Sequence, residues 1–202
     1  MKLAILALCL TVVAAHEEFQ ITTFSVIKLI SVSDGSRLHS HDVKYGSGSG
    51  QQSVTAVKTS DDVNSHWQVL PELGKDRPRG DVIHCDDVIR LKHLQTGHFL
   101  HSHHFDAPLS KGNQEVSCFG GGDKSDTGDN WKVICSSDDW YESEQVKLKH
   151  VDTEVYLSLS GQQYGRPISG QREVVGSSNV HSGSSWKTAE GIYIKHQEHT
   201  EH

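Results

Sequence analysis

Hydrophobic and polar residues alternate over short stretches along most of this chain, and one such pattern occurs three times. Each copy opens with an apolar strand pattern, and a Leu in that strand is followed nine residues later by another: Leu29 and Leu38, Leu91 and Leu100, Leu148 and Leu157. Each copy closes on a strand that begins at a Trp: Trp67, Trp131 and Trp186. A fixed internal period is the mark of a repeat architecture, so it determines the fold class before any single residue does.

Four short strands are expected in each copy. In the first, a Gly/Ser-rich turn at Gly46–Gly50 follows the second strand, Gln51–Val57 forms the third, and a polar loop leads to the Trp strand His66–Leu70. Alternation between turn residues is typical of half-buried strands, and no capped amphipathic helix is present. Three such units predict an all-β fold, a β-trefoil, in which six strands close into a barrel and three hairpins cap it.

This prediction places one β-trefoil domain at residues 16–194, with repeats at about 21–76, 84–138 and 139–194. A propeller fragment also has four strands per unit, but three blades are too few for a closed ring. A solenoid would need shorter repeats and distinct capping units. In a trefoil, the repeated Leu and Trp residues are most simply part of the core.

The two ends of the chain are expected to lie outside this domain. Residues 1–15 have the pattern of a secretory signal peptide, with Lys2, an apolar stretch at Leu3–Val13 and small residues before His16. That stretch is too short to span a membrane; the alternative is a buried N-terminal element. Residues 195–202 are polar and read as a flexible tail, and they contain no Lys/His-Asp-Glu-Leu retrieval signal.

Removal of a signal peptide would leave three cysteines in an oxidising compartment, where at most one internal bridge can form. Cys85 lies just before the first strand of the second repeat, and Cys135 just after its Trp strand. First and last strands of a trefoil repeat are neighbours near the barrel mouth, so we expect a Cys85–Cys135 disulfide. Cys118 lies mid-strand and is expected to be a buried free thiol.

Composition narrows the class of partner. The chain has 202 residues, a formal net charge of −7, 35% hydrophobic and 22% charged residues. That is enough for one sizeable core. The mild acidity, without any Lys/Arg run, argues against a nucleic-acid binder.

Two histidine pairs are the first candidates for chemistry. His39 and His41, and likewise His101 and His103, project from the same side of a strand, and zinc binds imidazole readily. The third repeat has Ser158 and Ser160 at this place. We therefore expect no metal site, and expect surface or hydrogen-bonded structural histidines.

Other polar motifs also read as turns. The stretch Asp123–Asp129 lacks the register and closing Glu of a calcium loop, and Gly46–Gly50 lacks the Gly-Lys-Ser/Thr ending of a phosphate cradle. The acidic pairs Asp61–Asp62, Asp86–Asp87 and Asp138–Asp139 abut turns and are expected to be solvated. No nucleophile motif is present, so we predict no catalytic residue and no cofactor.

Four segments carry a family resemblance: Leu38–Val54, Leu100–His104, Gly112–Ser117 and Tyr164–Gln171. They resemble the stromal cell-derived factor 2 family, small lumenal proteins of three MIR repeats, and the resemblance runs from about Ile21 to Ile194. It implies a β-trefoil. Cys85 and Cys135 match the family's second-repeat Cys pair. The pair flanking its first repeat is missing here, where Thr23–Phe24 and Gly74–Lys75 stand.

The resemblance implies a non-catalytic adaptor of the endoplasmic reticulum lumen, induced by unfolded-protein stress, although secretion is an alternative. Its partners would be a lumenal J-domain co-chaperone, BiP and non-native client proteins that it keeps soluble. MIR repeats also occur in protein O-mannosyltransferases, so a glycan- or mannose-binding module is the alternative function. The Gln-x-Trp signature of ricin-type lectin repeats is absent, since Ser65, Asp129 and Ser184 stand two residues before the Trp positions. A transferase ranks last because the chain has no donor-binding motif.

Overall fold

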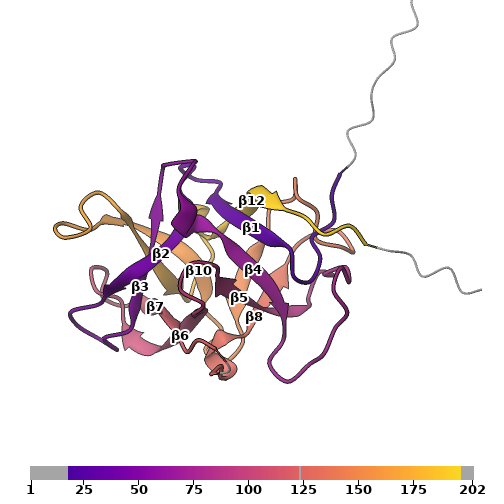
Figure 1. The fold of residues 1–202 in the computed structure, drawn as a ribbon. Helices are drawn as coiled ribbons and strands as arrows, with labels where there is room; N and C mark the ends of the chain where they lie inside the picture. Colours follow the sequence, from indigo (N-terminus) through magenta and orange to yellow (C-terminus); the bar gives the residue numbers. More distant parts are fainter. Residues whose placement is uncertain (1–17, 123, 197–202) are drawn as a thin grey trace, which may run out of the picture.

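The structure is a computed structural model that describes residues 18–122 and 124–196, and it is built almost entirely of short strands (Figure 1). The strands are β1 (Val26–Ser31), β2 (Arg37–Lys44), β3 (Gln52–Val57), β4 (Trp67–Pro71), β5 (Val88–His93), β6 (Phe99–Asp106), β7 (Gln114–Phe119), β8 (Trp131–Ile134), β9 (Lys147–His150), β10 (Tyr156–Gln163), β11 (Arg172–Ser177) and β12 (Trp186–Ile192). All twelve belong to one sheet, which makes the fold all-β as predicted.

Six of the strands close into a barrel. β1 pairs with β12 and β4, β4 with β5, β5 with β8, and β8 with β9, all antiparallel. A bridge between Val146 and Trp186 joins the β9 segment to β12 and completes the ring. Closure leaves no unpaired edge along the barrel wall, which protects the sheet from edge-to-edge association.

The other six strands form three hairpins, β2–β3, β6–β7 and β10–β11, at one end of the barrel. β3, β7 and β11 also pair with one another, so the three hairpins are joined into a cap. Both ends of the described chain leave the molecule on the side away from these hairpins (Figure 1). Each hairpin has one irregularity in register, located in the same place between its first and second strands.

The core follows the period seen in the sequence. The first-strand leucines, the second-strand leucines and the three repeat tryptophans are all fully buried. Each indole N–H donates to the carbonyl oxygen of the second-strand leucine: Trp67 to Leu38 at 3.0 Å, Trp131 to Leu100 at 3.0 Å, and Trp186 to Leu157 at 2.8 Å. A buried indole N–H needs a partner, so this bond fixes where the Trp strand packs on the hairpin.

Three one-turn 3-10 helices occur where the sequence predicted polar loops: Val63–Ser65, Thr127–Asp129 and Ser182–Ser184. Each directly precedes the Trp strand of its repeat. Asp126 and His181 cap the second and third of them by accepting from Gly128 N at 3.0 Å and Gly183 N at 3.1 Å. These caps are the local signal that could have indicated the turns.

The structure contains the expected disulfide, Cys85–Cys135, with the two Cα atoms 5.4 Å apart. Cys118 is a free and buried thiol within β7, and burial raises its pKa to about 12. A thiol held in this protonated form is a poor nucleophile.

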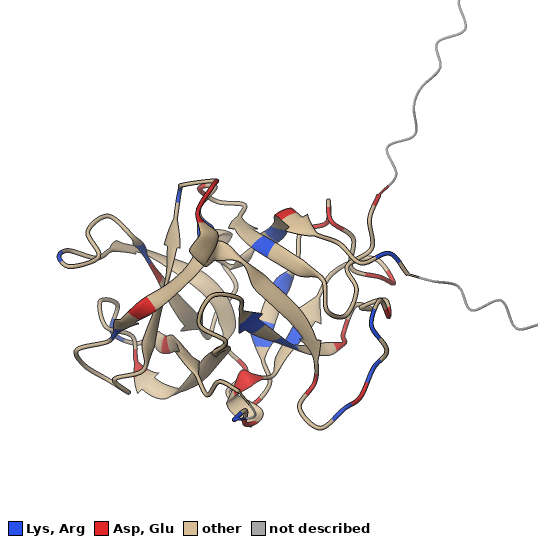
Figure 2. Ribbon diagram, viewed as in Figure 1, with Lys and Arg blue, Asp and Glu red and all other residues tan. Residues whose placement is uncertain are grey.

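The chain ends are only partly described. The expected signal peptide, residues 1–15, and residues 197–202 of the expected tail lie outside the described part. His196 lies against the domain, with Nδ1 3.1 Å from Gly80 O. Nowhere in residues 18–122 and 124–196 is there a helix long and apolar enough to cross a bilayer. Acidic and basic residues are interspersed, notably along the long loop between β4 and β5 (Figure 2).

Candidate functional site

The histidine pair of the first repeat lies within β2 and is held in place by neighbouring polar groups. His39 Nδ1 lies 2.7 Å from Asp62 Oδ2, and His39 Nε2 lies 2.6 Å from His41 Nδ1. Ser65 donates a further hydrogen bond to the same Asp62 oxygen at 2.5 Å. The His39 ring is only 5% exposed, so this network joins β2 to the 3-10 helix, as expected for a structural histidine.

The second repeat has a similar network with a different carboxylate. His101 Nδ1 lies 2.9 Å from Asp129 Oδ1 and 3.5 Å from Asp126 Oδ1, and these three residues could reach a common cation. Asp129 is fully buried, and its other oxygen accepts from Ser125 Oγ at 2.7 Å. A cation would have to replace the His101–Asp129 hydrogen bond, because both use the same imidazole nitrogen. The sequence singled out the Asp123–Asp129 stretch only as a turn, and it did not show the pairing with His101, which lies far along the chain.

Two further histidines, not singled out in the sequence, pack with tilted rings against two of the repeat tryptophans. His93 is fully buried beside Trp67, and His150 is fully buried beside Trp131. His93 Nε2 lies 2.9 Å from Asn64 O, and His150 Nε2 lies 2.9 Å from Gly128 O. Burial lowers the pKa of His93 to about 4, and burial also lowers the pKa of His150. Both imidazoles are therefore neutral structural groups at pH 7.

Two buried carboxylates anchor the hairpin loops. Glu115 accepts from the backbone N–H of Ser49 at 3.3 Å and lies 3.1 Å from His103 Nε2. Glu173 accepts from the backbone N–H of Leu109 at 2.6 Å and from Ser160 Oγ at 2.6 Å. Both side chains are fully buried. Each carboxylate thus connects its own strand to the loop of the preceding hairpin and so has a structural role.

The acidic pairs have partners. Asp87 Oδ2 lies 2.7 Å from Arg77 Nη1, and Asp139 Oδ1 lies 2.6 Å from His84 Nδ1. The sequence had suggested solvated turn residues, but each pair instead contacts a basic side chain, and in the Asp86–Asp87 pair both members do, since Asp86 Oδ1 lies 3.0 Å from Lys132 Nζ. No two of these carboxylates form the paired acid and base of a glycosidase across a described hollow.

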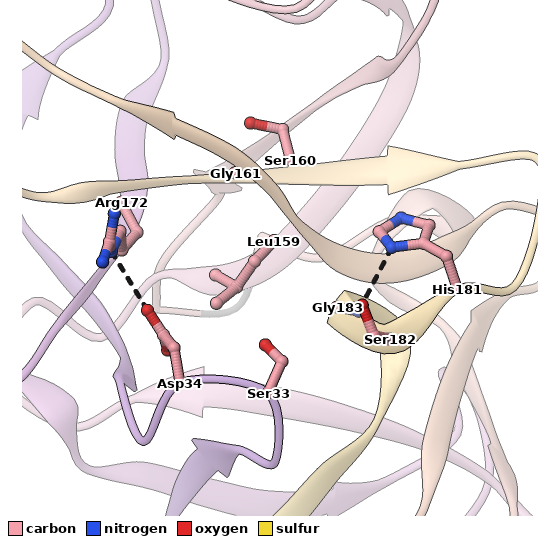
Figure 3. Close-up of a pocket in the computed structure, with 9 residues that line it drawn as sticks. All are labelled: Ser33, Asp34, Leu159, Ser160, Gly161, Arg172, His181, Ser182 and Gly183. Carbon is pink, nitrogen blue, oxygen red and sulfur yellow. Dashed lines mark hydrogen bonds and ion pairs between the residues drawn. The ribbon is translucent and has the colours of Figure 1, made fainter.

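The third repeat differs at the place of the histidine pairs. Ser158 stands where the other repeats have His39 and His101, and its Oγ lies 2.7 Å from Ser184 Oγ. Ser160 likewise stands at the place of the second histidine. A hollow of about 310 Å³, lined in part by Ser160, lies between the third repeat and the β1–β2 turn (Figure 3).

Polar groups line this hollow. Arg172 Nε donates to Asp34 Oδ2 at 3.0 Å, and His181 Nδ1 accepts from Gly183 N (Figure 3). Among the nine residues drawn, no serine hydroxyl is hydrogen-bonded to the His181 ring. Guanidinium, imidazole and hydroxyl groups of this kind can hold a small hydroxylated ligand.

Comparison with known proteins shows the family. The MIR domain family matches residues 34–183. Human stromal cell-derived factor 2 is 51% identical over 178 residues, which cover 88% of this chain and 84% of the human protein. The chain belongs to the stromal cell-derived factor 2 family. The resemblance inferred from four sequence motifs is thereby confirmed.

Solved structures agree with this family assignment. A Caenorhabditis elegans protein of unknown function is 67% identical, with a TM-score of 0.84 over 88% of this chain and 99% of that chain. The SDF2-like protein of Arabidopsis thaliana is 44% identical, with a TM-score of 0.86 over 89% of this chain and all of that chain. The present chain also matches part of the S. cerevisiae protein O-mannosyltransferase Pmt1–Pmt2 complex bound to the sugar donor. There the identity is 26% and the TM-score 0.79, over 90% of this chain and 26% of that chain.

Proposed function

We propose that this member of the stromal cell-derived factor 2 family is a non-catalytic adaptor in protein quality control of the endoplasmic reticulum lumen. It would assist a J-domain co-chaperone and BiP, and keep non-native clients soluble. The observation that carries the proposal is the family match over nearly the whole chain. The networks of His39, His101, Glu115 and Glu173 also support binding over catalysis, because these groups hold the scaffold.

The scaffold proposed for this adaptor is a β-trefoil of three four-stranded MIR repeats. A six-stranded barrel capped by three mutually paired hairpins supports that assignment. Such a barrel is rigid and carries its variation in loops, which is where binding residues tend to lie.

One set of exposed side chains recurs in all three repeats and suits client contact. Val32, Leu94 and Val151 each follow the last residue of a first strand, and they are 40%, 49% and 42% exposed. Each backbone N–H donates to the carbonyl of the residue before a Trp strand, at 3.0, 3.0 and 3.1 Å. Three aliphatic contact points on a fixed frame fit the apolar segments that non-native chains expose.

The proposed compartment is the endoplasmic reticulum lumen, with secretion as the alternative. The Cys85–Cys135 disulfide supports either, because such bonds persist in oxidising compartments.

Affinity purification tests the adaptor proposal. Tagged protein is recovered from a lumenal extract, and the bound proteins are identified by mass spectrometry. We expect a J-domain protein and BiP, and recovery of neither counts strongly against the proposal. In parallel, light scattering from a chemically denatured reporter should fall when the protein is present. The triple variant Val32→Ser, Leu94→Ser, Val151→Ser should lose that effect. The control Val180→Ser, Ile192→Ser removes two other exposed aliphatics and should keep it.

A second candidate function is glycan recognition, in particular of mannose. The observation that favours it is the structural match to a protein O-mannosyltransferase complex whose structure holds a sugar donor. The hollow of Figure 3, called the Arg172 hollow from here on, supplies polar groups that suit hydroxylated ligands. A glycan array probed with the purified protein tests this function, and the absence of any binding at high micromolar protein would remove it.

A further inference from the structure

A second hollow lies between the second and third repeats, near the loop that joins β6 to β7. Its volume is about 290 Å³, and it is lined by residues of β6, the start of β7, the β9–β10 turn and the end of β11. The hydrogen-bonded side chains of His39, His101, Glu115 and Glu173 do not line this hollow.

The floor of this hollow exists because Gly176 has no side chain. Gly176 pairs with Gln114, and the same pairing joins Cys118 to Gln52 and Ala56 to Arg172 in the other two junctions. Gly176 therefore takes the place of a residue that has a Cβ in both other repeats. A Cβ at Gly176 would lie 2.4 Å from Val155 Cγ2, so a larger residue would displace the wall of the hollow.

Phe105 supplies an aromatic face at the rim. It lies in the irregular part of β6, between the paired residues Ser102 and Asp106, where the strand bulges. Bulges redirect side chains, and here the ring is 47% exposed. The edge-on contact with His103, at 4.8 Å between centroids, holds the ring from one side. The other hairpins have Val43 and Gln162 at this position, so the aromatic face belongs to the second repeat.

Free polar groups flank the ring. The side chains of His104 and Asp106 line the hollow and make no hydrogen bond or ion pair with any residue in the described ranges. Asn113 also lines it, and its amide N–H donates to Ser110 Oγ at 3.0 Å, which leaves the side-chain oxygen available. The hollow thus offers a carboxylate, an imidazole and an amide oxygen beside an exposed ring.

We propose that this hollow binds a pyranose unit of a glycan, stacked on Phe105. A pyranose has one apolar C–H face, which suits an aromatic ring, and hydroxyl groups that donate to carboxylate and amide oxygens. Asp106 accepts from two neighbouring hydroxyls, while His104 and Asn113 orient the sugar. This proposal deepens the glycan-binding candidate function and rests on it.

The other hollows suit a sugar less well. The Arg172 hollow has no Phe, Tyr or Trp among its lining residues, and the nitrogen Nδ1 of its one ring, His181, already accepts from Gly183 N. In the hollow beside the chain ends, Phe19 and Tyr193 stack on each other at 6.0 Å, and Lys195 Nζ lies 5.7 Å from the Phe19 centroid. Those rings are already covered, whereas the exposed face of Phe105 is open to a ligand.

Saturation-transfer difference NMR with the full chain tests the site. The probes are the methyl glycosides of α-mannose, α-glucose, β-galactose and N-acetylglucosamine. The wild-type protein should bind at least one at millimolar affinity. Phe105→Ala should weaken that binding by about tenfold or more, whereas Phe105→Tyr, which keeps the ring, should retain it. Leu109→Ala, an exposed aliphatic on the loop of the same hairpin, is the matched control and should bind as the wild type does. Asp106→Asn should weaken binding severalfold.

The outcomes separate the two proposals. Unchanged binding by Phe105→Ala overturns this site but leaves glycan recognition standing. Binding that survives Phe105→Ala but disappears in Arg172→Gln would place the sugar in the other hollow. If the wild type binds none of the four sugars and no glycan on the array, both the site and the glycan function are wrong. Because Phe105 and Asp106 are exposed, circular dichroism should show every variant folded.

Discussion

The first two repeats and the third share a scaffold but fill the same place with different side chains. In the first two, His39 and His101 bind to carboxylates beside the 3-10 helix. In the third, Ser158 is hydrogen-bonded to Ser184, and Ser160 lines a hollow of about 310 Å³. The core beneath is the same, since each Trp donates to a second-strand Leu carbonyl. A repeat can therefore lack this histidine–carboxylate network and still keep the fold.

The side-chain pair that joins each repeat to the next also differs in the third repeat. Gln52 Nε2 donates to Thr96 Oγ1 at 3.0 Å, and Gln114 Nε2 donates to Thr153 Oγ1 at 2.7 Å. In the third repeat, the equivalent pair is Arg172 with Asp34. A neutral bridge is thus replaced by an ion pair at the one junction where the histidines are absent. The backbone arrangement is the same at all three junctions, but two are joined by a neutral hydrogen bond and the third by an ion pair.

The largest expected effect is on the free energy of unfolding, and it tests whether the first and third repeats contribute equally to the core. Trp67→Ala and Trp186→Ala should each lower the free energy of unfolding by about 3–5 kcal/mol, because each removes a fully buried indole and leaves a cavity. Urea unfolding followed by circular dichroism measures both. A much smaller loss for Trp186→Ala would show that the third repeat contributes less to the common core.

The disulfide distinguishes the second repeat from the other two. It closes a segment with a sequence separation of 50. Its removal in Cys85→Ala, Cys135→Ala should lower the free energy of unfolding by about 2–4 kcal/mol, through the larger freedom of the unfolded chain. Reduction of the wild type before urea unfolding is the control and should give the same loss. Equal stability with and without the bond would contradict this prediction.

The sequence predicted the elements that depend on periodicity. The Leu and Trp period placed the strands and the core, because buried faces repeat with the fold. The Cys85–Cys135 bond was predictable because both residues flank strands that must be neighbours. The pairing of His101 with Asp129, and the meeting of Phe105 with Gly176, depend on long-range contacts that periodicity does not report. The Arg172 hollow and the Phe105 hollow were missed for the same reason, because each is lined by residues from two different repeats.

Acid stability should separate the first two repeats from the third. His93 pairs with Trp67 and His150 with Trp131, whereas Ser31, which cannot titrate, pairs with Trp186. The folded pKa of His93 is about 4, below its unfolded value of about 6.5. The unfolded chain therefore binds protons first as the pH falls. Stability is full above about pH 6.5 and declines toward pH 4, with His93 contributing up to about 3 kcal/mol of the loss. Urea unfolding at a series of pH values measures this decline. In His93→Gln the decline should be shallower, and an unchanged slope would contradict the assignment.

The smallest expected effect comes from making the third junction resemble the others. Arg172→Gln with Asp34→Thr reproduces the Gln–Thr pair of the first two junctions. The ion pair that it replaces is partly solvent-exposed, and such pairs contribute about 0–1 kcal/mol. The free energy of unfolding should therefore change by less than about 1 kcal/mol, whereas either single substitution should be slightly worse than the pair. Urea unfolding of the four proteins forms a double-mutant cycle that isolates the interaction between the two positions. A loss of several kcal/mol in the double variant would mean that the ion pair, and not the shared backbone, holds the third repeat to the first.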